Sequence, residues 1–440
     1  MVLATGDIVN IDIRAIAERS KQASHAVARL NEAQKNAALD AMADAIEKNS
    51  AAILRANADD LTTASTMLAN GEITASTFER LKLAPSKLSE MAHSIRSVAA
   101  LADPVGRILE RTQLDDGLII EKVSCSIGVL AVIFEARPDA VTQIAALAVK
   151  SGNAVIMKPG REVEGTATAL VETLRCALRQ CNIAEDAINL ILGREAVQQL
   201  LSISDLVDLV IPRGSRQLVE HIQGNTRIPV LGHADGICHV YVDAAADPTM
   251  ALAIIDDSKT DYPAVCNAAE TALIHEGIAR EFLPQLATRL EAKKVKLLGC
   301  EKTRAILGDV VESVANWHTE YGDLVLAIRV VRNMDEAIDH IHRYGSSHTE
   351  TIVTNDVNAA ARFLNEVDSA GVFHNCSTRF ADGYRYGFGA EVGISTSKLH
   401  ARGPVGLDGL TTYKYVLHGE GHVVGEYRKG ARNFKHKRLS

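Results

Sequence analysis

The chain has 440 residues, of which 47% are hydrophobic and 23% charged, and its formal net charge is −8. This length allows two or three domains, and the composition is typical of a globular protein. A general nucleic-acid binder usually has a basic surface, so the charge argues against that class, although a local basic pocket for a small anion remains possible.

The N-terminal residues lack the pattern of a secretory signal, and no run of about 18 apolar residues predicts a membrane-spanning helix. The seven cysteines are scattered and form no Cys-x-x-Cys pair, which favours neither a disulfide framework nor a zinc site. We therefore expect a cytoplasmic protein that binds no metal, nucleic acid or membrane.

Residues 11–100 are predicted to be helical, because apolar residues such as Ile13, Ile16, Ala23 and Val27 recur on one helical face. Residues 112–126 predict a β-hairpin, since Asp116-Gly117 is a strong turn dipeptide. These segments are expected to form a helical layer packed on a sheet, followed by a hairpin.

Two blocks of alternating strands and helices follow, which indicates parallel, doubly wound sheets. In the first block we expect strands at 128–134, 153–157, 188–192 and 206–211, and helices at 139–150, 164–180 and 195–202. In the second we expect strands at 271–275, 294–298, 323–331, 349–354 and 370–375, and helices at 278–292, 335–343 and 356–366. The β-forming tail at 411–427 predicts surface strands that could pair with another subunit.

The stretch from Ser258 to Thr271 lies between the two blocks and holds the candidate nucleophile, Cys266. A proline and two small residues precede it, which is typical of a turn that exposes a side chain. A thiol attacks as the thiolate, so it needs a helix N-terminus or a nearby cation. A buried structural cysteine is the alternative. A reactive cysteine here predicts a cleft at the junction of two α/β domains.

No Gly-x-Gly-x-x-Gly fingerprint joins a strand to a helix, but two strand ends could bind a dinucleotide. The stretch 156–161 places Lys158 and Arg161 after a buried strand. The stretch 211–216 leads through Gly214-Ser215 into a helix whose first amides could hold a pyrophosphate. Exposed loop residues are the alternative in both cases.

Three further groups could bind ligands. Glu135 and Arg137 leave a core strand toward the expected cleft, with a salt bridge as the alternative. The histidines at 340, 342 and 348 resemble a metal cluster, but their spacing and the lack of a carboxylate partner favour structural histidines. The glycine-rich, basic stretch 379–402 is typical of a loop that recognises carboxylate or phosphate.

With these residues assembled, the chain resembles the γ-glutamyl phosphate reductases (glutamate-5-semialdehyde dehydrogenases), a branch of the aldehyde dehydrogenase superfamily, over essentially its full length. The stretch 331–352 resembles the family signature at every fixed position, and 133–139, 232–243, 261–267 and 386–397 also match. The resemblance implies an aldehyde-dehydrogenase-like α/β fold of two doubly wound domains. We expect an NADPH-binding domain at 1–110 and 127–237, a catalytic domain at 238–400, and a β-hairpin oligomerisation arm at 111–126 and 401–440.

The family reduces L-glutamate 5-phosphate with NADPH to the 5-semialdehyde and phosphate, the second step of proline biosynthesis from glutamate, through a cysteine thioester. The resemblance makes Cys266 the nucleophile and places Lys158 at the adenine ribose, Ser215 at the pyrophosphate and Glu320 at the nicotinamide ribose. Pro159, Arg161 and Gly214 complete the implied cofactor site, and the substrate candidates are Arg137, Asn267, Lys398 and Arg402. The implied partners are a second copy of the chain, in a dimer or tetramer, and glutamate 5-kinase.

Departures from the wider superfamily agree with this chemistry. Hydrolytic members carry a Glu-Leu-Gly-Gly motif with the base that activates water, whereas residues 230–236 here contain no glutamate. NAD-preferring members have Pro-x-Glu where this chain has Pro159-Gly160-Arg161, and arginine can pair with a 2′-phosphate. The Trp-Asn oxyanion motif is missing near Arg137, which leaves the Cys266 backbone N–H as a candidate donor.

Two alternatives remain at this point. One is another aldehyde dehydrogenase or a CoA-acylating aldehyde reductase, which would use a different acyl acceptor in the oxidising direction. The other is a non-catalytic scaffold that retains the fold.

Overall fold

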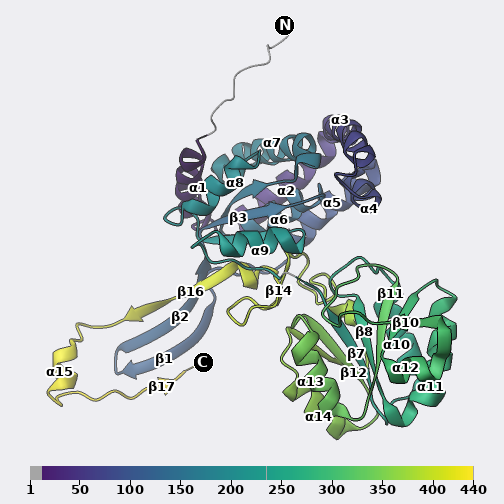
Figure 1. The fold of residues 1–440 in the computed structure, drawn as a ribbon. Coiled ribbons are helices and arrows are strands. Elements are labelled where there is room, and N and C mark those ends of the chain that lie inside the picture. Colours follow the sequence, from purple (N-terminus) through teal and green to yellow (C-terminus); the bar gives the residue numbers. More distant parts are fainter. Residues whose placement is uncertain (1–11, 234, 440) are drawn as a thin grey trace.

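The computed structural model describes residues 12–233 and 235–439. Figure 1 shows three parts: a first α/β body containing α1–α9, a second α/β body containing α10–α14, and an arm of antiparallel strands. Within the described residues, none of the helices combines the length and apolar character needed to span a membrane.

The first body is built on a parallel sheet with the strand order β5-β4-β3-β6. Its strands are β3 (Val129–Phe134), β4 (Ala154–Lys158), β5 (Ile188–Leu190) and β6 (Leu209–Arg213). Its helices are α1 (Ile13–Val27), α2 (Glu32–Lys48), α3 (Ser50–Ala69), α4 (Ala75–Leu81), α5 (Pro85–Ala99), α6 (Ala140–Lys150), α7 (Glu164–Gln180), α8 (Glu195–Ser202) and α9 (Arg216–Gly224). The predicted helical layer and alternating block are confirmed.

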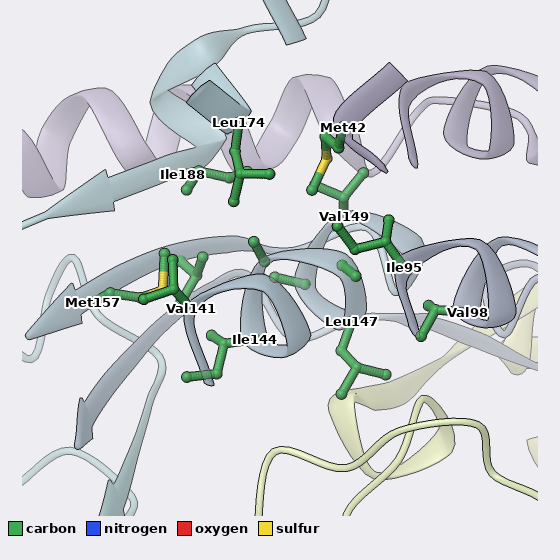
Figure 2. Close-up of a cluster of buried hydrophobic side chains, with 14 of the residues drawn as sticks. Met42, Ile95, Val98, Val141, Ile144, Leu147, Val149, Met157, Leu174 and Ile188 are labelled. Carbon is green, nitrogen blue, oxygen red and sulfur yellow. The ribbon is translucent and has the colours of Figure 1, made fainter. Parts of the chain in front are cut away.

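Both faces of this sheet are covered, which explains why β3 is apolar at every position and buried throughout. Side chains of α2, α5, α6 and α7 fill one face (Figure 2), and α1, α8 and α9 cover the other. The sheet is therefore doubly wound, as predicted. Because β4 and β6 lie on opposite sides of β3, the loops that follow β3 and β6 diverge at the carboxyl edge. The crevice between two such diverging loops is where sheets of this kind usually bind their ligands.

The second body holds a seven-stranded parallel sheet in the order β10-β9-β11-β8-β7-β12-β13. Its strands are β7 (Cys238–Val242), β8 (Ala269–His275), β9 (Lys296–Gly299), β10 (Val311–Ser313), β11 (Val325–Val331), β12 (Thr349–Val353) and β13 (Gly371–His374). Its helices are α10 (Pro248–Thr260), α11 (Glu276–Glu291), α12 (Glu301–Leu307), α13 (Met334–Tyr344) and α14 (Val357–Glu366). Core side chains of α10 and α11 pack on one face, and those of α13 and α14 on the other.

Four elements of the second body are absent from the prediction: the strands β7 and β10 and the helices α10 and α12. In α10 the buried face includes Asp256, Ser258 and Lys259 beside the isoleucines, so polar residues interrupt the apolar periodicity. All the strands and helices that were predicted for the second block are present, and their ends differ from the predicted ends by a few residues.

The arm is an antiparallel sheet in the order β16-β2-β1-β17. Strands β1 (Ile108–Asp115) and β2 (Leu118–Ser126) form the predicted hairpin, in which Gly117 has a φ of +69° that glycine adopts without strain. Strand β16 (Thr411–His418) pairs with β2, and the short β17 (Lys437–Arg438) pairs with β1. The predicted strands beyond residue 418 are wrong, because the short helix α15 (Val424–Arg428) follows the turn at Gly421.

The segment 390–410 returns to the first body. It contains the paired strands β14 (Ile394–Ser395) and β15 (Gly403–Pro404). Its apolar side chains Ala390, Val392, Ala401, Val405, Leu407 and Leu410 belong to the same core as β3 and α6. The predicted boundary at residue 400, between a catalytic domain and an arm, therefore differs from the packing, because this contact joins residues far apart in the chain.

Candidate active site

A cleft of about 2170 Å³ is lined by residues of both α/β bodies, as predicted for their junction. The first body contributes the loops after β3, β4 and β6, at the carboxyl edge of its sheet. The second contributes Cys266, which precedes β8 and so lies at the amino edge of the other sheet. The cleft brings together eight of the predicted site residues: Cys266, Asn267, Arg137, Lys158, Arg161, Gly214, Ser215 and Glu320.

Lys398 and Arg402 are absent from this lining among the described residues. Both form ion pairs with Asp368, and Arg402 Nη2 lies 2.9 Å from Asp368 Oδ1. Asp368 follows α14, so these two cations join the returning segment 390–410 to the second body. Their predicted substrate role has no support from this geometry. Pro159 is likewise not among the described residues that line the cleft.

The half-buried Cys266 lies in a turn between α10 and β8. A Cβ added to Gly236 would lie 2.4 Å from Cys266 Cα, so only glycine allows the loop before β7 to approach so closely. Cys238 Sγ donates to the carbonyl oxygen of Cys266 across 3.2 Å. No helix begins at Cys266 in the described chain, so the expected helix N-terminus does not act on the thiol, and a cation is the remaining source of activation.

Arg213, at the end of β6, is a cation whose charge interacts with that of Cys266. Burial lowers the pKa of Arg213 to about 10, which still leaves the guanidinium charged at neutral pH. Its Nη1 is buried and has no hydrogen-bond partner among the described residues. Sequence reasoning assigned this loop to the cofactor alone. The sequence signal that could have singled out Arg213 is a cation at the last position of a buried strand.

Two other arginines of the cleft have protein partners. Arg137 Nη2 lies 3.1 Å from Asp139 Oδ2; burial opposes ionisation of Asp139, but the arginine lowers the pKa of that carboxyl. The nearly buried Arg379 donates to Asp261 at 3.1 Å and to the side-chain oxygen of Asn267. Asn267 Nδ2 donates to the carbonyl of Ala381 at 2.8 Å, so both ends of this amide are engaged. Asn267 thus orients Arg379.

Two imidazoles lie beside Cys266. One ring nitrogen each of His233 and His348, together with Cys266 Sγ, lie within 4.8 Å of one another. Of the histidines predicted to resemble a metal cluster, only His348 belongs to this group. His340 bonds Arg329 at 2.9 Å, with burial lowering its pKa to about 2, and His342 Nε2 accepts the N–H of Asp368 at 3.3 Å.

The residues predicted to bind the cofactor lie at the ends of β4 and β6. Lys158 is half-buried, and burial lowers its pKa while nearby glutamates oppose the shift. Ser215 caps α9, its Oγ accepting the N–H of Leu218 at 3.4 Å. The N–H of Ser215 donates to Glu135 Oε2 at 3.1 Å, so a carboxylate already lies at the helix start. A pyrophosphate held there has to displace this carboxylate, because two anions repel at such distances.

Glu270 belongs to a buried ion pair and also connects the two chain segments that carry Cys266 and Glu320. Lys259 Nζ donates to Glu270 Oε2 at 2.8 Å, and neither side chain has appreciable solvent exposure. Glu270 Oε1 accepts the N–H of Gly322 at 3.1 Å. Burial raises the pKa of Glu270 to about 7, and Lys259 opposes this shift. Glu270 therefore fixes the loop of Glu320 to the strand that follows Cys266.

The fold and the cysteine-bearing cleft define an enzyme of the aldehyde dehydrogenase type, and a model of the aldehyde dehydrogenase family matches residues 5–302. γ-Glutamyl phosphate reductase of Synechococcus sp. (strain JA-2-3B'a(2-13)) is 53% identical over 421 residues, which cover 95% of this chain and 92% of that protein. The γ-glutamyl phosphate reductase of Cyanothece sp. (strain PCC 7425 / ATCC 29141) is 51% identical over 430 residues, which cover 98% of this chain and 98% of that protein.

Among solved structures, γ-glutamyl phosphate reductase from Thermotoga maritima superposes with a TM-score of 0.90 at 39% identity, covering 93% of this chain and 99% of that one. The chain therefore belongs to the γ-glutamyl phosphate reductases, an oxidoreductase branch of the aldehyde dehydrogenase family. This result confirms the family and fold inferred from the sequence motifs.

Glu270→Gln retains the shape of the side chain but removes the charge that balances Lys259. We expect the free energy of unfolding to fall by about 3–5 kcal/mol, because an uncompensated charge stays buried. Urea unfolding at mildly alkaline pH, followed by fluorescence of Trp317, the single tryptophan, measures the change.

The control is Glu312→Gln, which breaks the exposed pair with Lys296 and is expected to cost less than about 1 kcal/mol. Equal, small decreases in the free energy of unfolding of the two variants would show that the buried pair has no such structural role.

Proposed function

We propose that the chain reduces L-glutamate 5-phosphate with NADPH to L-glutamate 5-semialdehyde and phosphate, the second step of proline biosynthesis from glutamate. One observation carries the proposal: a single cleft holds Cys266, an unpartnered buried arginine nitrogen, and the loops expected to hold a dinucleotide. Membership of the γ-glutamyl phosphate reductases supports this substrate over other acyl donors.

In the proposed first step, the Cys266 thiolate attacks the acyl carbon and the bond from that carbon to the phosphate oxygen breaks. Phosphate leaves with the electron pair, and a γ-glutamyl thioester forms on the sulfur. Phosphate is a good leaving group, so this step depends on positioning and on oxyanion stabilisation more than on a strong acid. The backbone N–H of Cys266 is the candidate oxyanion donor, since the amide of Asn267 is engaged elsewhere.

NADPH, when bound, supplies a hydride to the thioester carbon. The anionic thiohemiacetal that results expels the Cys266 thiolate and releases the aldehyde. Water must not reach the thioester in an activated form. The loop at 230–236 carries one carboxylate, Asp235, and Arg216 Nη1 holds it at 2.9 Å. This ion pair leaves the loop without a free carboxylate base.

Cys266→Ala removes the sulfur and is expected to reduce semialdehyde-dependent NADP⁺ reduction in phosphate buffer by about a thousandfold or more. Cys181→Ala, on the first body away from the cleft, is the matched control and should leave the rate unchanged. A C266A rate near that of the wild type, with NADP⁺ binding intact, would refute the role of this residue.

The aldehyde dehydrogenase family uses a nicotinamide cofactor, and NADPH is proposed here because of Arg161. This arginine is exposed at the carboxyl edge, three residues beyond Lys158, and pairs with Glu72. A 2′-phosphate can replace Glu72 as its partner, because the guanidinium binds phosphate and carboxylate in the same way. Lys158 and the first amides of α9 would hold the adenine ribose and the pyrophosphate.

Arg161→Gln is expected to raise the KM for NADPH by about tenfold or more, the loss of one charge-assisted hydrogen bond, and to leave the KM for NADH unchanged. Glu72→Gln is the matched variant: it frees Arg161 and should maintain or strengthen the preference for NADPH. Steady-state kinetics with both cofactors provide the measurement. Equal changes for NADPH and NADH in R161Q would contradict the assignment.

We further propose that Arg213 binds the phosphate of the substrate, because its Nη1 lacks a protein partner and its charge interacts with Cys266. Arg213→Gln is expected to raise the KM for phosphate in the oxidising direction by about tenfold or more. Arg332→Gln, on an exposed arginine, is the control. An unchanged KM for phosphate in an R213Q enzyme that still binds NADP⁺ would overturn this role.

We also propose an oligomeric state, a source of the substrate and a compartment. The arm exposes Leu109, Tyr413, Tyr415 and Leu417, apolar surface that supports pairing with a second copy in a dimer or tetramer. Glutamate 5-kinase is the proposed source of the acyl phosphate, and the cytoplasm the proposed compartment. Dependence of the oxidising reaction on phosphate, and not on CoA or water, separates this enzyme from other aldehyde dehydrogenases. Failure to bind NADP⁺ would instead favour a scaffold.

A further inference from the structure

The group formed by Cys266, His233 and His348 lies in the segments before three neighbouring strands of one sheet. Cys266 precedes β8, His233 precedes β7 and His348 precedes β12, and these strands are adjacent in the order β8-β7-β12. Parallel strands begin at the same edge, so the sheet places Cys266 and His348 side by side. His233 follows Leu231, whose N–H donates to the carbonyl of Val210 on β6, so the chain leaving the first body brings the second imidazole to this edge. Their ligand atoms lie within 4.8 Å of one another.

Each imidazole is oriented by a bond at Nδ1. His233 Nδ1 donates to the carbonyl of Ile394 at 2.8 Å, and His348 Nδ1 lies 2.9 Å from Thr349 Oγ1. These are the outer partners that metal-binding histidines commonly have, and an Nδ1 that donates to such an oxygen leaves Nε2 with a free lone pair. Nε2 is thus the available ligand atom of both rings.

His348 Nε2 requires an explanation of its own. The side chain is completely buried, and this nitrogen has no hydrogen-bond partner among the described residues. An unpaired buried polar atom is costly, and such atoms are uncommon in folded proteins. The cleft function proposed above assigns no task to this nitrogen. A cation bound between His348, His233 and Cys266 would satisfy it.

We propose that Cys266, His233 and His348 bind one Zn²⁺ ion, with the fourth position open to the cleft, and that the bound ion inhibits the enzyme. One thiolate and two imidazoles form a ligand set that zinc accepts and that Mg²⁺ and Ca²⁺ do not. Binding replaces the thiol proton, which is released to solvent. Bond lengths of about 2.0–2.3 Å require the ligand atoms to draw together by about 1 Å, which the half-buried loop of His233 allows.

The inhibitory character of the site rests on the proposed role of Cys266 as nucleophile. A sulfur lone pair coordinated to zinc cannot attack an acyl phosphate, so the metal-bound protein is inactive until the ion is removed. The metal site itself does not depend on that role, and the two can be tested separately.

Co²⁺ serves as the probe for the site. In the wild-type protein we expect one equivalent of Co²⁺ to give the visible absorption of a tetrahedral ion and the near-ultraviolet charge-transfer band of a thiolate ligand. Zn²⁺ should displace it. His233→Gln should weaken Co²⁺ binding by at least about tenfold, since loss of an outer partner alone costs about 10–100-fold, and Cys266→Ser should abolish the charge-transfer band.

The matched control is His221→Gln, which alters a histidine that lines the same cleft but lies outside the cluster. This variant should bind Co²⁺ like the wild type. A tetrahedral spectrum that persists in both His233→Gln and Cys266→Ser, or no one-equivalent site in the wild type, would overturn the metal site.

Activity is the second readout. Zn²⁺ should inhibit the wild-type enzyme, a chelator should restore the rate, and His233→Gln should need at least about tenfold more Zn²⁺ for the same inhibition. Unchanged sensitivity in this variant would refute the inhibitory site. If Cys266→Ser loses the Co²⁺ charge-transfer band but remains active, the proposed catalytic role fails while the metal site stands.

Discussion

The close approach of the loop before β7 to Cys266 is the contact on which the site depends. Gly236 faces the cysteine backbone at a distance that no Cβ could occupy, and Cys238 donates to the same cysteine's carbonyl. The N–H of Ile237 donates to Ser346 Oγ at 2.8 Å, which brings the segment before β12 into the same contact. One glycine thus allows three strand beginnings to converge on Cys266.

The two sheets contribute opposite edges to the cleft. In the first body, the loops that diverge after β3 and β6 lie at the carboxyl edge, where the dipoles and amides of helix starts favour anions. In the second body, Cys266 lies at the amino edge, and the turn around it carries no helix start. The proposed sites for the cofactor phosphates and for the covalent chemistry therefore lie on opposite edges, and Arg213, which lines the same cleft as Cys266, ends a strand of the first sheet. The ion pairs of Asp368 with Lys398 and Arg402 help to join the bodies across this gap.

Local features of this fold could be predicted from the sequence, because their causes are local. The fully apolar β3, the Asp116-Gly117 turn and the helix spanning 164–180 each follow from a few adjacent residues. The family motifs also identified the cleft residues around Cys266. By contrast, three features depend on contacts between segments that are distant in the chain. They are the packing of 390–410 on the first core, the charge interaction of Arg213 with Cys266, and the proximity of His233 to His348. No periodicity or spacing in the chain encodes them.

The pairing of Asp235, the one carboxylate of the loop at 230–236, has a chemical consequence that links these observations. A thioester survives to accept hydride only if nearby groups do not activate water, and the one carboxylate of the loop at 230–236 is held by Arg216. The groups placed closest to the sulfur by these observations are the imidazoles of His233 and His348, within 4.8 Å, and the charge of Arg213 also interacts with Cys266. Such groups suit an incoming phosphate and a departing one equally well, which agrees with a reaction that is reversible through phosphate. The same nitrogen-rich surroundings, with a thiol at their centre, also make the site a ligand set for a soft divalent metal.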